Sequence, residues 1–333
     1  MGARGGVERE ALEKFIGRRG IGRFGDGRIS VREITCGKLR RYFSFRNFID
    51  FFKVPVGIIQ SFFIVLKFKP EVLFSKGGFV AVPVVIGAKL AGIFSRGKVS
   101  IIIHESDVVP GLANRISAKF ADKIFVSFEE SVGFFKGSAG RCVTVTGNPV
   151  RREIFGGSLE AGLKMCRFNR FKTIILAMGG SQGAMQINNL IWNNLDEILK
   201  KYQVVHIVGK GNFNIGVKKA GYKQFELLFE ELKDIYACSS IVVSRGGANS
   251  LAEISALNKK AVIIPLGEET SRGDQIKNTK ICVGEYGWQA LYGDVTGEQF
   301  LRAIELANRA EFEGEKSLHE GAAKRIAEEL AAL

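Results

Sequence analysis

The stretch from Ile241 to Glu253 holds residue types that suit the binding of a nucleotide. An apolar run rich in β-branched residues is followed by Arg245-Gly246-Gly247 and then by a helical pattern. This order predicts a buried strand, a tight turn and the N-terminus of a helix. The first amides of such a helix lack intrahelical partners, and the helix dipole favours an anion there. Because glycine lets backbone approach a ligand closely, Gly246 and Gly247 are candidate phosphate contacts.

Glu253 lies near the end of the second turn of this predicted helix. A carboxylate at that place could accept hydrogen bonds from both hydroxyls of a ribose, as an acidic residue does in other nucleotide-binding folds. A glycine-rich connection followed by a solvated glutamate would leave the same sequence. This stretch alone therefore fits a nucleotide site and an ordinary turn equally well.

Two further strand-to-helix turns favour the nucleotide site. Thr173–Met178 is predicted as a strand, and it runs through Gly179-Gly180-Ser181-Gln182-Gly183-Ala184 into a helix expected over Met185–Lys200. A third strand end is followed by Gln275 and Asn278, whose side chains could bond sugar hydroxyls. Parallel strands bring their carboxyl ends to the same edge of a sheet, so we expect these turns to face one ligand.

Together these motifs resemble the donor half of the MurG family of glycosyltransferases. That family transfers N-acetylglucosamine to the lipid-linked muramyl pentapeptide of peptidoglycan synthesis. The first half of the chain is similar to the family as well, and it holds four segments in the family's order and spacing: Gly77–Pro83, His104–Asp107, Gly111–Asn114 and Gly147–Arg151. Several motifs in order are far more specific than one glycine-rich loop, and the resemblance covers nearly the whole chain.

The resemblance implies an α/β fold of the GT-B class, in which two Rossmann-like doubly wound domains face each other across a cleft. Residues 1–155 would form the acceptor- and membrane-facing domain, and residues 156–333 the domain that binds the UDP-sugar donor. In the second domain we expect an unpatterned basic connection over Leu159–Phe171 and a strand over Phe225–Phe229. A C-terminal helix, expected over Leu318–Leu333, often crosses back onto the first domain in this fold.

The implied reaction is the inverting transfer of N-acetylglucosamine from UDP-N-acetylglucosamine to the muramyl unit of undecaprenyl-diphosphate-linked muramyl pentapeptide (lipid I to lipid II). This hexosyltransferase step would take place at the cytoplasmic face of the cell membrane, with the enzyme bound peripherally. Two alternatives stay open. One is a GT-B transferase that uses another lipid acceptor, such as diacylglycerol, and the other is a UDP-sugar-binding protein without transferase activity.

The resemblance also assigns roles in the donor site. Glu253 would contact the ribose, Gln275 the sugar hydroxyls, and backbone beyond Ser244 the base. The other candidate substrate-binding residues are Asp107, Asn114, Arg151, Gly179, Gly180, Ser181, Gln182, Gly183, Gly246, Gly247 and Asn278. The family usually has asparagine at the position of Asp107, which weakens the transfer of that residue's role.

In the first domain, the acceptor's diphosphate would lie against Gly77, Gly78 and Phe79. His104 and Glu105 follow the next predicted strand, and they are the best-placed proton acceptors for the attacking hydroxyl. A lone histidine at a strand end is as often a structural residue. Both interpretations of His104 stay open at this point.

No cofactor and no bound metal are expected. The five cysteines are scattered without a Cys-x-x-Cys pair, which is typical of a reducing compartment, and the three histidines form no ligand cluster. No Asp-x-Asp motif is evident, and backbone amides with a helix dipole could stabilise the departing diphosphate instead.

The charge of the chain is concentrated near its start. The formal net charge is +14, and residues 1–70 hold 15 Lys and Arg against 6 Asp and Glu. Such a basic block is typical of proteins that bind nucleic acid or an anionic membrane surface. No nucleic-acid-binding motif is found, so we expect no nucleic acid partner.

Residues 40–69 favour the membrane surface. Phenylalanines alternate there with Lys and Arg, and the apolar run Val54–Leu66 is shorter than the roughly 20 residues of a membrane span. We expect this basic, Phe-rich segment to lie in the interface of an anionic membrane. The alternative is that its phenylalanines form one face of a helix packed in the core.

The start of the chain departs from the family. Gly20–Gly25 matches G-x-G-x-x-G, but a strand follows it where a helix is required, so we expect a loop. The family begins with a strand, a Gly-Gly-Thr-Gly-Gly-His loop and a helix, and none of these is found here. Because the first strand of a doubly wound sheet is central, and the family's loop carries a candidate catalytic base, we expect an incomplete first domain with impaired activity.

Overall fold

The computed structural model describes residues 1–3, 30–37, 45–94, 99–137, 142–180, 183–268, 271, 273–311 and 317–333, with residues 45–51 described by their backbone. The loop expected at Gly20–Gly25, the first residues of the Phe-rich segment, Ser181 and Gln182 therefore lie outside the described residues.

The chain divides into two compact units. Unit 1 comprises Met1–Glu105, Pro110–Val145 and Glu329–Leu333, and unit 2 comprises Ser106–Val109 and Thr146–Glu328. The main division therefore lies between Val145 and Thr146, whereas the motifs led us to expect it at residue 155. The last residues of the chain belong with unit 1, where Lys123 pairs with Glu329 at 3.2 Å.

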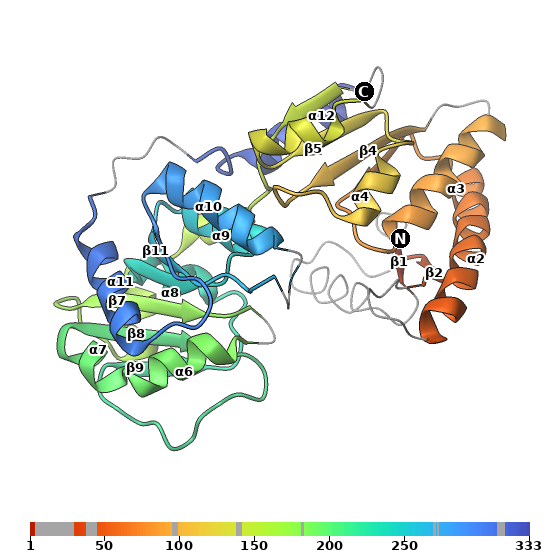
Figure 1. Ribbon diagram of the computed structural model, residues 1–333. Coiled ribbons are helices and arrows are strands. Elements are labelled where there is room, and N and C mark those ends of the chain that lie inside the picture. Colours follow the sequence, from red (N-terminus) through yellow and green to blue (C-terminus); the bar gives the residue numbers. More distant parts are fainter. Residues whose placement is uncertain are drawn as a thin grey trace. The chain divides into compact units, whose positions relative to one another are not determined.

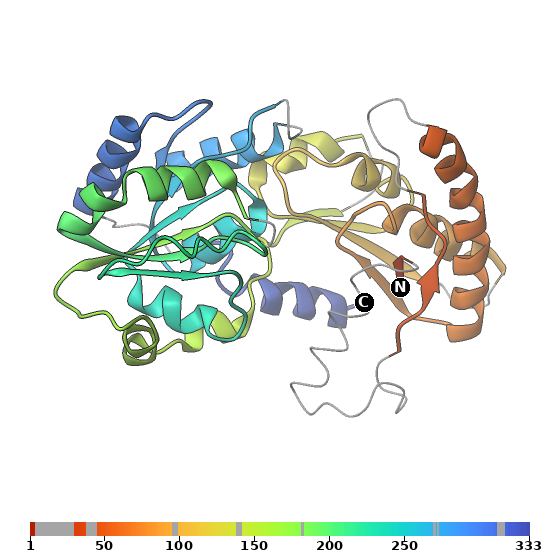
Figure 2. The same cartoon turned by 90° about the horizontal axis from the view of Figure 1, so that it is seen from below.

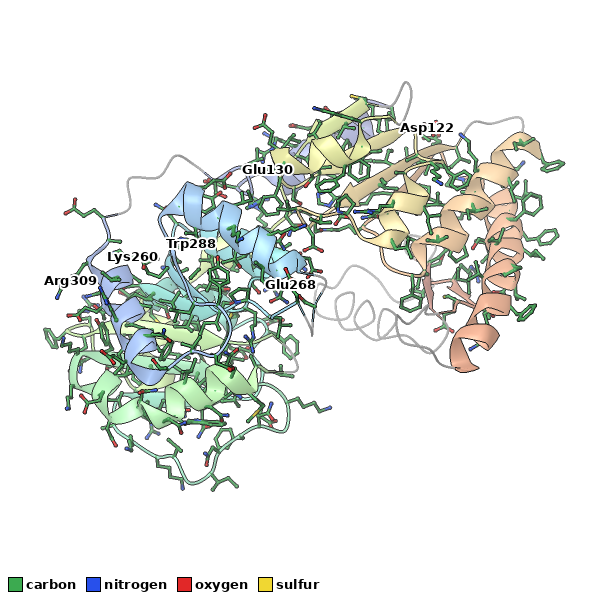
Figure 3. All side chains as sticks on the ribbon, in the orientation of Figure 1. Asp122, Glu130, Lys260, Glu268, Trp288 and Arg309 are labelled. Atoms are coloured by element: carbon green, nitrogen blue, oxygen red, sulfur yellow. The ribbon has the colours of Figure 1, made fainter. Side chains whose placement is uncertain are left out.

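Unit 1 contains a four-stranded parallel sheet in the order β3-β4-β5-β6. Its strands are β3 (Val72–Ser75), β4 (Ser100–Glu105), β5 (Lys123–Val126) and β6 (Cys142–Val145) (Figure 1). Side chains on both faces of β4 are fully buried, including Ile101, Ile102 and Ile103, as expected for a parallel sheet covered on both sides. Asp122, labelled in Figure 3, accepts a hydrogen bond from the Ile101 amide at 2.8 Å and so fixes the start of β4.

Several helices complete unit 1. These are α2 (Phe45–Phe68), α3 (Ala81–Phe94), α4 (Leu112–Ser117) and the 3-10 helix η1 (Glu129–Phe135). A separate parallel pair is formed by β1 (Gly2–Ala3) and β2 (Glu33–Ile34). In the part of the chain that the structure describes, no helix combines the length and the apolarity needed to cross a membrane.

Helices α2 and α3 lie side by side along one flank of unit 1 (Figures 1 and 2). Small residues allow this close approach: a Cβ added to Gly87 would lie 2.7 Å from the Cβ of Ser61. Val65, on the same side of α2, is 2% exposed and belongs to the core of the unit. One face of α2 therefore packs in the core of unit 1.

Unit 2 contains a six-stranded parallel sheet in the order β12-β11-β10-β7-β8-β9. The strands are β7 (Thr173–Met178), β8 (Tyr202–Ile207), β9 (Tyr222–Phe225), β10 (Ile241–Ser244), β11 (Lys260–Ile263) and β12 (Gln289–Ala290). The helices are η2 (Arg152–Gly156), α5 (Leu159–Cys166), α6 (Met185–Asn193), α7 (Leu195–Lys201), α8 (Leu232–Cys238), α9 (Ala248–Ala256), α10 (Asp274–Tyr286), α11 (Gly297–Arg309) and α12 (Ala322–Ala331).

One core of unit 2 lies between the sheet and helices α6, α7 and α11. It joins Ile187, Ile198 and Phe300 from the helices to Ile175 and Val243 from the strands. The intervening strand residues are fully buried as well, so the sheet is covered on both faces. This is the doubly wound arrangement expected from the sequence.

Some elements differ from expectation. The segment expected to be an unpatterned connection forms α5, because Ser158 caps its N-terminus and Gly162 allows close packing against α8. The helix expected over Met185–Lys200 is divided at Asn194, whose side chain bonds back to the Leu190 carbonyl at 2.8 Å. Strand β9 begins and ends earlier than expected. The C-terminal helix α12 begins at Ala322, later than Leu318.

The five cysteines are free thiols in different environments. Cys142, the first residue of β6, is exposed, and Cys36 is half-buried. Cys166, Cys238 and Cys282 are buried, and burial raises the pKa of Cys166 to about 12.

Candidate active site

Two glycine-rich turns lie next to each other at the carboxyl edge of the sheet of unit 2. Strands β7 and β10 pair in parallel, with Val243 opposite Ala177. Gly179-Gly180 follows β7 and Gly246-Gly247 follows β10, so the structure brings the two predicted turns together. Gly180 has φ +80°, which a residue with a side chain rarely adopts.

The N-terminus of α9 has no side-chain cap. Its first flanking residue is Gly247, in an extended conformation. The first amides of the helix are thus left to water or to a ligand, which makes this end suitable for a phosphate. The glycine before it is held close to α10, because a side chain at Gly246 would collide with Thr279.

Glu253, the predicted ribose contact, lies in α9 beside another predicted site residue. Its Oε1 atom accepts a hydrogen bond from Arg151 Nη2 at 3.1 Å, and its Oε2 atom accepts one from the Tyr236 hydroxyl at 3.3 Å. The side chain of Glu253 is 17% exposed, whereas that of Arg151 is 54% exposed. Tyr236 is fully buried on α8, and sequence reasoning missed it because only the fold places it against α9.

The predicted sugar-binding residues of α10 differ in their availability. Gln275 accepts a hydrogen bond from the Leu266 amide at 3.1 Å. Asn278 is fully buried: its Oδ1 atom accepts from the Val108 amide, and its Nδ2 atom donates to Asp107 Oδ1, both at 2.9 Å. The side chains of Asn278 and Asp107 are therefore hydrogen-bonded to each other. Glu268, labelled in Figure 3, stands in the loop that leads to α10.

A polar network surrounds Asn148 in the predicted Gly147–Arg151 motif. The Asn148 side chain accepts from the Ser106 hydroxyl at 3.2 Å and donates to Asn249 Oδ1 at 2.9 Å. The Asn148 backbone amide donates to His319 Nδ1 at 3.0 Å. Burial lowers the pKa of His319 to about 4, with a smaller contribution from Arg325, so this imidazole is neutral and able to accept.

Arg245 was not predicted as a site residue, although it stands between the strand β10 and the two glycines. Its Nη1 atom donates to Gln186 Oε1 at 2.7 Å and to the Ile264 carbonyl at 2.9 Å. Burial lowers the pKa of this guanidinium below its ordinary value. The signal in the sequence was the Arg-Gly-Gly run itself, but the partner Gln186 lies on α6 and was not foreseeable.

The predicted residues of unit 1 gather at the carboxyl edge of its sheet. Gly77 and Gly78 follow β3 with φ +87° and +85°. A Cβ at Gly77 would lie 2.9 Å from the amide group of Asn114, so this turn and α4 are in close contact. The Oδ1 atom of Asn114 is buried and has no hydrogen-bond partner, which leaves an acceptor beside the turn.

The two predicted proton acceptors end strand β4. Glu105 is 4% exposed, and its Oε2 atom accepts from the Gly111 amide at 3.1 Å and from Asn114 Nδ2 at 2.8 Å. His104 is fully buried, and its ring centroid lies 6.4 Å from that of Phe74. Glu105 thus holds the loop before α4 in addition to any part in proton transfer.

A cavity of about 900 Å³ lies in unit 1 beside the glycine turn. It is lined by the predicted acceptor contacts Gly77, Gly78 and Phe79, and by Phe63 and Phe68 of α2. The described residues include no group of three His, Cys, Asp or Glu side chains able to hold a metal ion.

Comparison with known proteins defines the class. Residues 15–126 match the model of the glycosyltransferase family 28 N-terminal domain, and residues 174–330 that of the glycosyltransferase family 28 C-terminal domain. The crystal structure of Acinetobacter baumannii MurG covers 100% of this chain, and the match spans 98% of that chain, with a TM-score of 0.65 and 16% identity. The chain is therefore a glycosyltransferase with the GT-B fold.

Two curated relatives show to which family of glycosyltransferases the chain belongs. A protein of Clostridium botulinum is 46% identical over 279 residues, which are 84% of this chain and 72% of the relative. A protein of Bacillus cereus is 42% identical over 311 residues, 93% of this chain and 82% of the relative. The first is named UDP-N-acetylglucosamine--N-acetylmuramyl-(pentapeptide) pyrophosphoryl-undecaprenol N-acetylglucosamine transferase, and the second bears the same name followed by the number 2. This chain belongs to the MurG family.

Proposed function

We propose that this chain transfers N-acetylglucosamine from UDP-N-acetylglucosamine to the muramyl unit of a lipid-linked pentapeptide, the lipid I to lipid II step of peptidoglycan synthesis. The relatives' names supply the substrates. The observation that carries the donor half is the uncapped start of α9 beside Glu253, because it offers free amides for a diphosphate and a carboxylate for a ribose.

The donor is expected to bind at the carboxyl edge of unit 2. The amides at the start of α9 and the turn at Gly179, Gly180 and Gly183 would contact the diphosphate and sugar. Glu253 would receive the ribose hydroxyls, and Arg151, which pairs with Glu253 and is half-exposed, would contact an anionic group of the donor. Gln275 would bond the sugar hydroxyls through its Nε2 atom, since its Oε1 atom is already held.

In the reaction, the acceptor hydroxyl attacks the anomeric carbon from the face opposite the diphosphate. The new carbon–oxygen bond forms as the bond to UDP breaks, and UDP leaves with the electron pair. A base takes the hydroxyl proton, and backbone amides stabilise the leaving group. Among the described residues His104 and Glu105 stay the predicted proton acceptors.

The acceptor lipid is expected to enter through unit 1. The outer side of α2 carries an exposed apolar stripe of Phe52, Val56, Ile59 and Phe63, whose exposed fractions lie between 45% and 62%. Spacings of four, three and four residues put them on one helix face. The opposite face of α2 packs in the core, so the expected membrane face and the alternative core face are two sides of the same helix.

This stripe suits the interface of an anionic membrane. It continues onto α3, where Ile93 and Phe94 are 70% and 74% exposed, and Phe94 meets Phe62 edge to face at 5.7 Å. The cavity beside Gly77 is lined by Phe63 and Phe68, so it leads from the stripe to the turn proposed to bind the acceptor's diphosphate.

A transfer assay with UDP-N-acetylglucosamine and the lipid-linked muramyl pentapeptide tests the proposal. We expect product with this acceptor and none with diacylglycerol. Glu253→Ala is expected to abolish saturable binding of UDP-N-acetylglucosamine, and Glu253→Gln, which keeps a partner for Tyr236, to weaken it. Glu160→Ala, which removes an exposed ion pair with Arg170 in the same unit, is the control and should bind normally.

Other outcomes select the alternatives. Saturable donor binding without product from any acceptor would identify a UDP-sugar-binding protein. Product from diacylglycerol alone would identify a different lipid acceptor. Unchanged binding by Glu253→Ala would show that the donor site is wrongly assigned.

A further inference from the structure

Arg245 is a partly buried cation whose contacts are all neutral. Its Nη1 atom donates to a side-chain amide oxygen and to a backbone carbonyl. Its Nε atom is buried and has no hydrogen-bond partner. Within the described part of the chain, no carboxylate pairs with this guanidinium. Burying a charge without a counter-charge is unfavourable, so such a group indicates an anion that the protein is built to receive.

Gln186 holds the guanidinium in place. It lies in the first turn of α6, two residues after Ala184, and its Oε1 atom accepts from Arg245. Its own Nε2 atom donates to the Gly293 carbonyl at 2.8 Å. Both ends of the amide are therefore used, and the orientation of Gln186 is fixed. A neutral acceptor orients the guanidinium without cancelling its charge.

The location connects the charge to the donor site. Arg245 ends the β10 run and precedes Gly246-Gly247, while Gln186 follows the other glycine turn. The hydrogen bond between them thus ties together the two turns proposed above to contact the donor. The amides at the start of α9 provide partial positive charge there, and Arg245 adds a full one.

We propose that Arg245 is the counter-charge for the diphosphate of the nucleotide donor. Gln186 is then the positioning residue: it orients the guanidinium and leaves its positive charge unpaired. The proposal rests on the proposed function and deepens it. As the bond to the sugar breaks, the diphosphate gains negative charge, and a guanidinium fixed beforehand stabilises that charge without reorganisation.

Gln186→Glu tests the proposal most sharply. The substitution preserves shape and gives Arg245 an ionic partner, but it removes the Nε2 donor to the Gly293 carbonyl. These two effects on thermal stability oppose each other, so we expect only a small change in the melting temperature. The substitution also cancels the charge offered to the diphosphate. We expect at least a tenfold loss of affinity for UDP, measured by titration calorimetry, with affinity for uridine, which has no phosphate, unchanged. Arg245→Gln should give the same pattern.

Gln299→Glu is the matched control, because it makes the same charge change in the same unit. Gln299 completes the capping box of α11 with Thr296, a role that glutamate fills equally well, so UDP binding should not change. Gln186→Met is the second variant. It keeps the charge of Arg245 but removes its orienting acceptor, and we expect a smaller loss of UDP affinity with uridine again unaffected.

The outcomes separate this proposal from the proposed function. If the unsubstituted chain binds UDP and Gln186→Glu binds it equally well, the role of Arg245 is wrong and the donor site stands. If UDP and uridine affinities fall together, Gln186 acts on the fold and the proposal is again overturned. If the unsubstituted chain does not bind UDP, the donor site and this proposal both fail.

Discussion

Charged residues at the two sheet edges are held in opposite ways. Glu105 is surrounded by donors, because the Gly111 amide and Asn114 both bond its carboxylate, and it thereby fixes a loop. Arg245 has neutral acceptors and keeps its charge for a ligand. The sequence placed both residues at strand ends. It could not show the partner of Arg245, because Arg245 and Gln186 are 59 residues apart.

Glu105→Gln separates the two roles of this residue. The amide oxygen of glutamine can still accept from Gly111 and Asn114, so we expect the free energy of unfolding to change by about 1 kcal/mol or less. Loss of a general base should lower kcat of transfer by about 10² to 10⁴. Urea unfolding and the transfer assay measure the two effects. Transfer at the unsubstituted rate would show that Glu105 only positions the loop.

Two buried histidines predict an acid-sensitive fold. Burial lowers the pKa of His206 to about 3 and that of His319 to about 4. Both values lie below the ordinary value, so the unfolded chain binds more protons. Their contribution to stability is therefore complete above about pH 6.5. It is lost by about 1.4 kcal/mol per pH unit for each histidine as the pH falls toward 4 for His319 and toward 3 for His206.

His319→Gln tests this dependence. We expect the variant to be less stable at every pH, because His319 Nδ1 accepts from the Asn148 amide. Between pH 6.5 and pH 4.5, the variant should lose less stability than the unsubstituted chain, and the difference should equal the contribution of one histidine. Denaturant unfolding at several pH values gives the slope. An unchanged slope would show that His319 is protonated in the folded protein at these pH values.

At the scale of elements, apolar runs bounded by glycine or polar residues were the most predictable. Thr173–Met178 begins and ends as expected, because buried parallel strands are short, apolar runs rich in β-branched residues. Helix α5 was missed because it is short and contains Gly162. Its stability comes from the Ser158 cap and from packing against α8, which local sequence does not reveal.

The exposed stripe of α2 gives a prediction about membrane binding. Replacing Ile59 and Phe63 together by serine should weaken binding to vesicles that contain anionic lipid by about tenfold per residue, because each side chain loses about 1–2 kcal/mol of apolar burial in the interface. Co-sedimentation measures the binding. Thermal stability should be unchanged, since the two side chains are 57% and 62% exposed.

Phe171→Ser is the control for this experiment. Phe171 lies in unit 2 and is 91% exposed, so the variant removes an exposed aromatic ring that is not part of α2. It should bind vesicles normally. Equal loss of binding by both variants, or none by the α2 variant, would contradict the assignment of the stripe.

At the scale of the whole molecule, the two units have separate hydrophobic cores. We expect calorimetry to show two unfolding transitions. UDP should raise the unfolding temperature of unit 2 only. At a UDP concentration one hundred times its Kd, the free energy of unfolding of that unit should increase by about 2.7 kcal/mol. The calorimetry is done in buffer without lipid vesicles. A single transition shifted as a whole by UDP would show that the units unfold together.

The same scale explains which parts of the candidate site were predictable. Glycine turns, Glu253 and Gln275 follow strand ends in the sequence, so topology alone brings them to one edge of a sheet. The contacts of Tyr236, Gln186 and Asn278 join residues that are far apart in the sequence, so only the folded chain shows them. Asn278 was expected to bond sugar, and instead both ends of its amide bond the protein.

The environments of the cysteines allow selective chemistry. Three of the five thiols are buried, and the raised pKa of Cys166 keeps it in the unreactive thiol form. Cys142, at the start of an outer strand of unit 1, is exposed. A maleimide dye used briefly at neutral pH should therefore attach first to Cys142, which would mark the acceptor half of the transferase for fluorescence studies without any substitution.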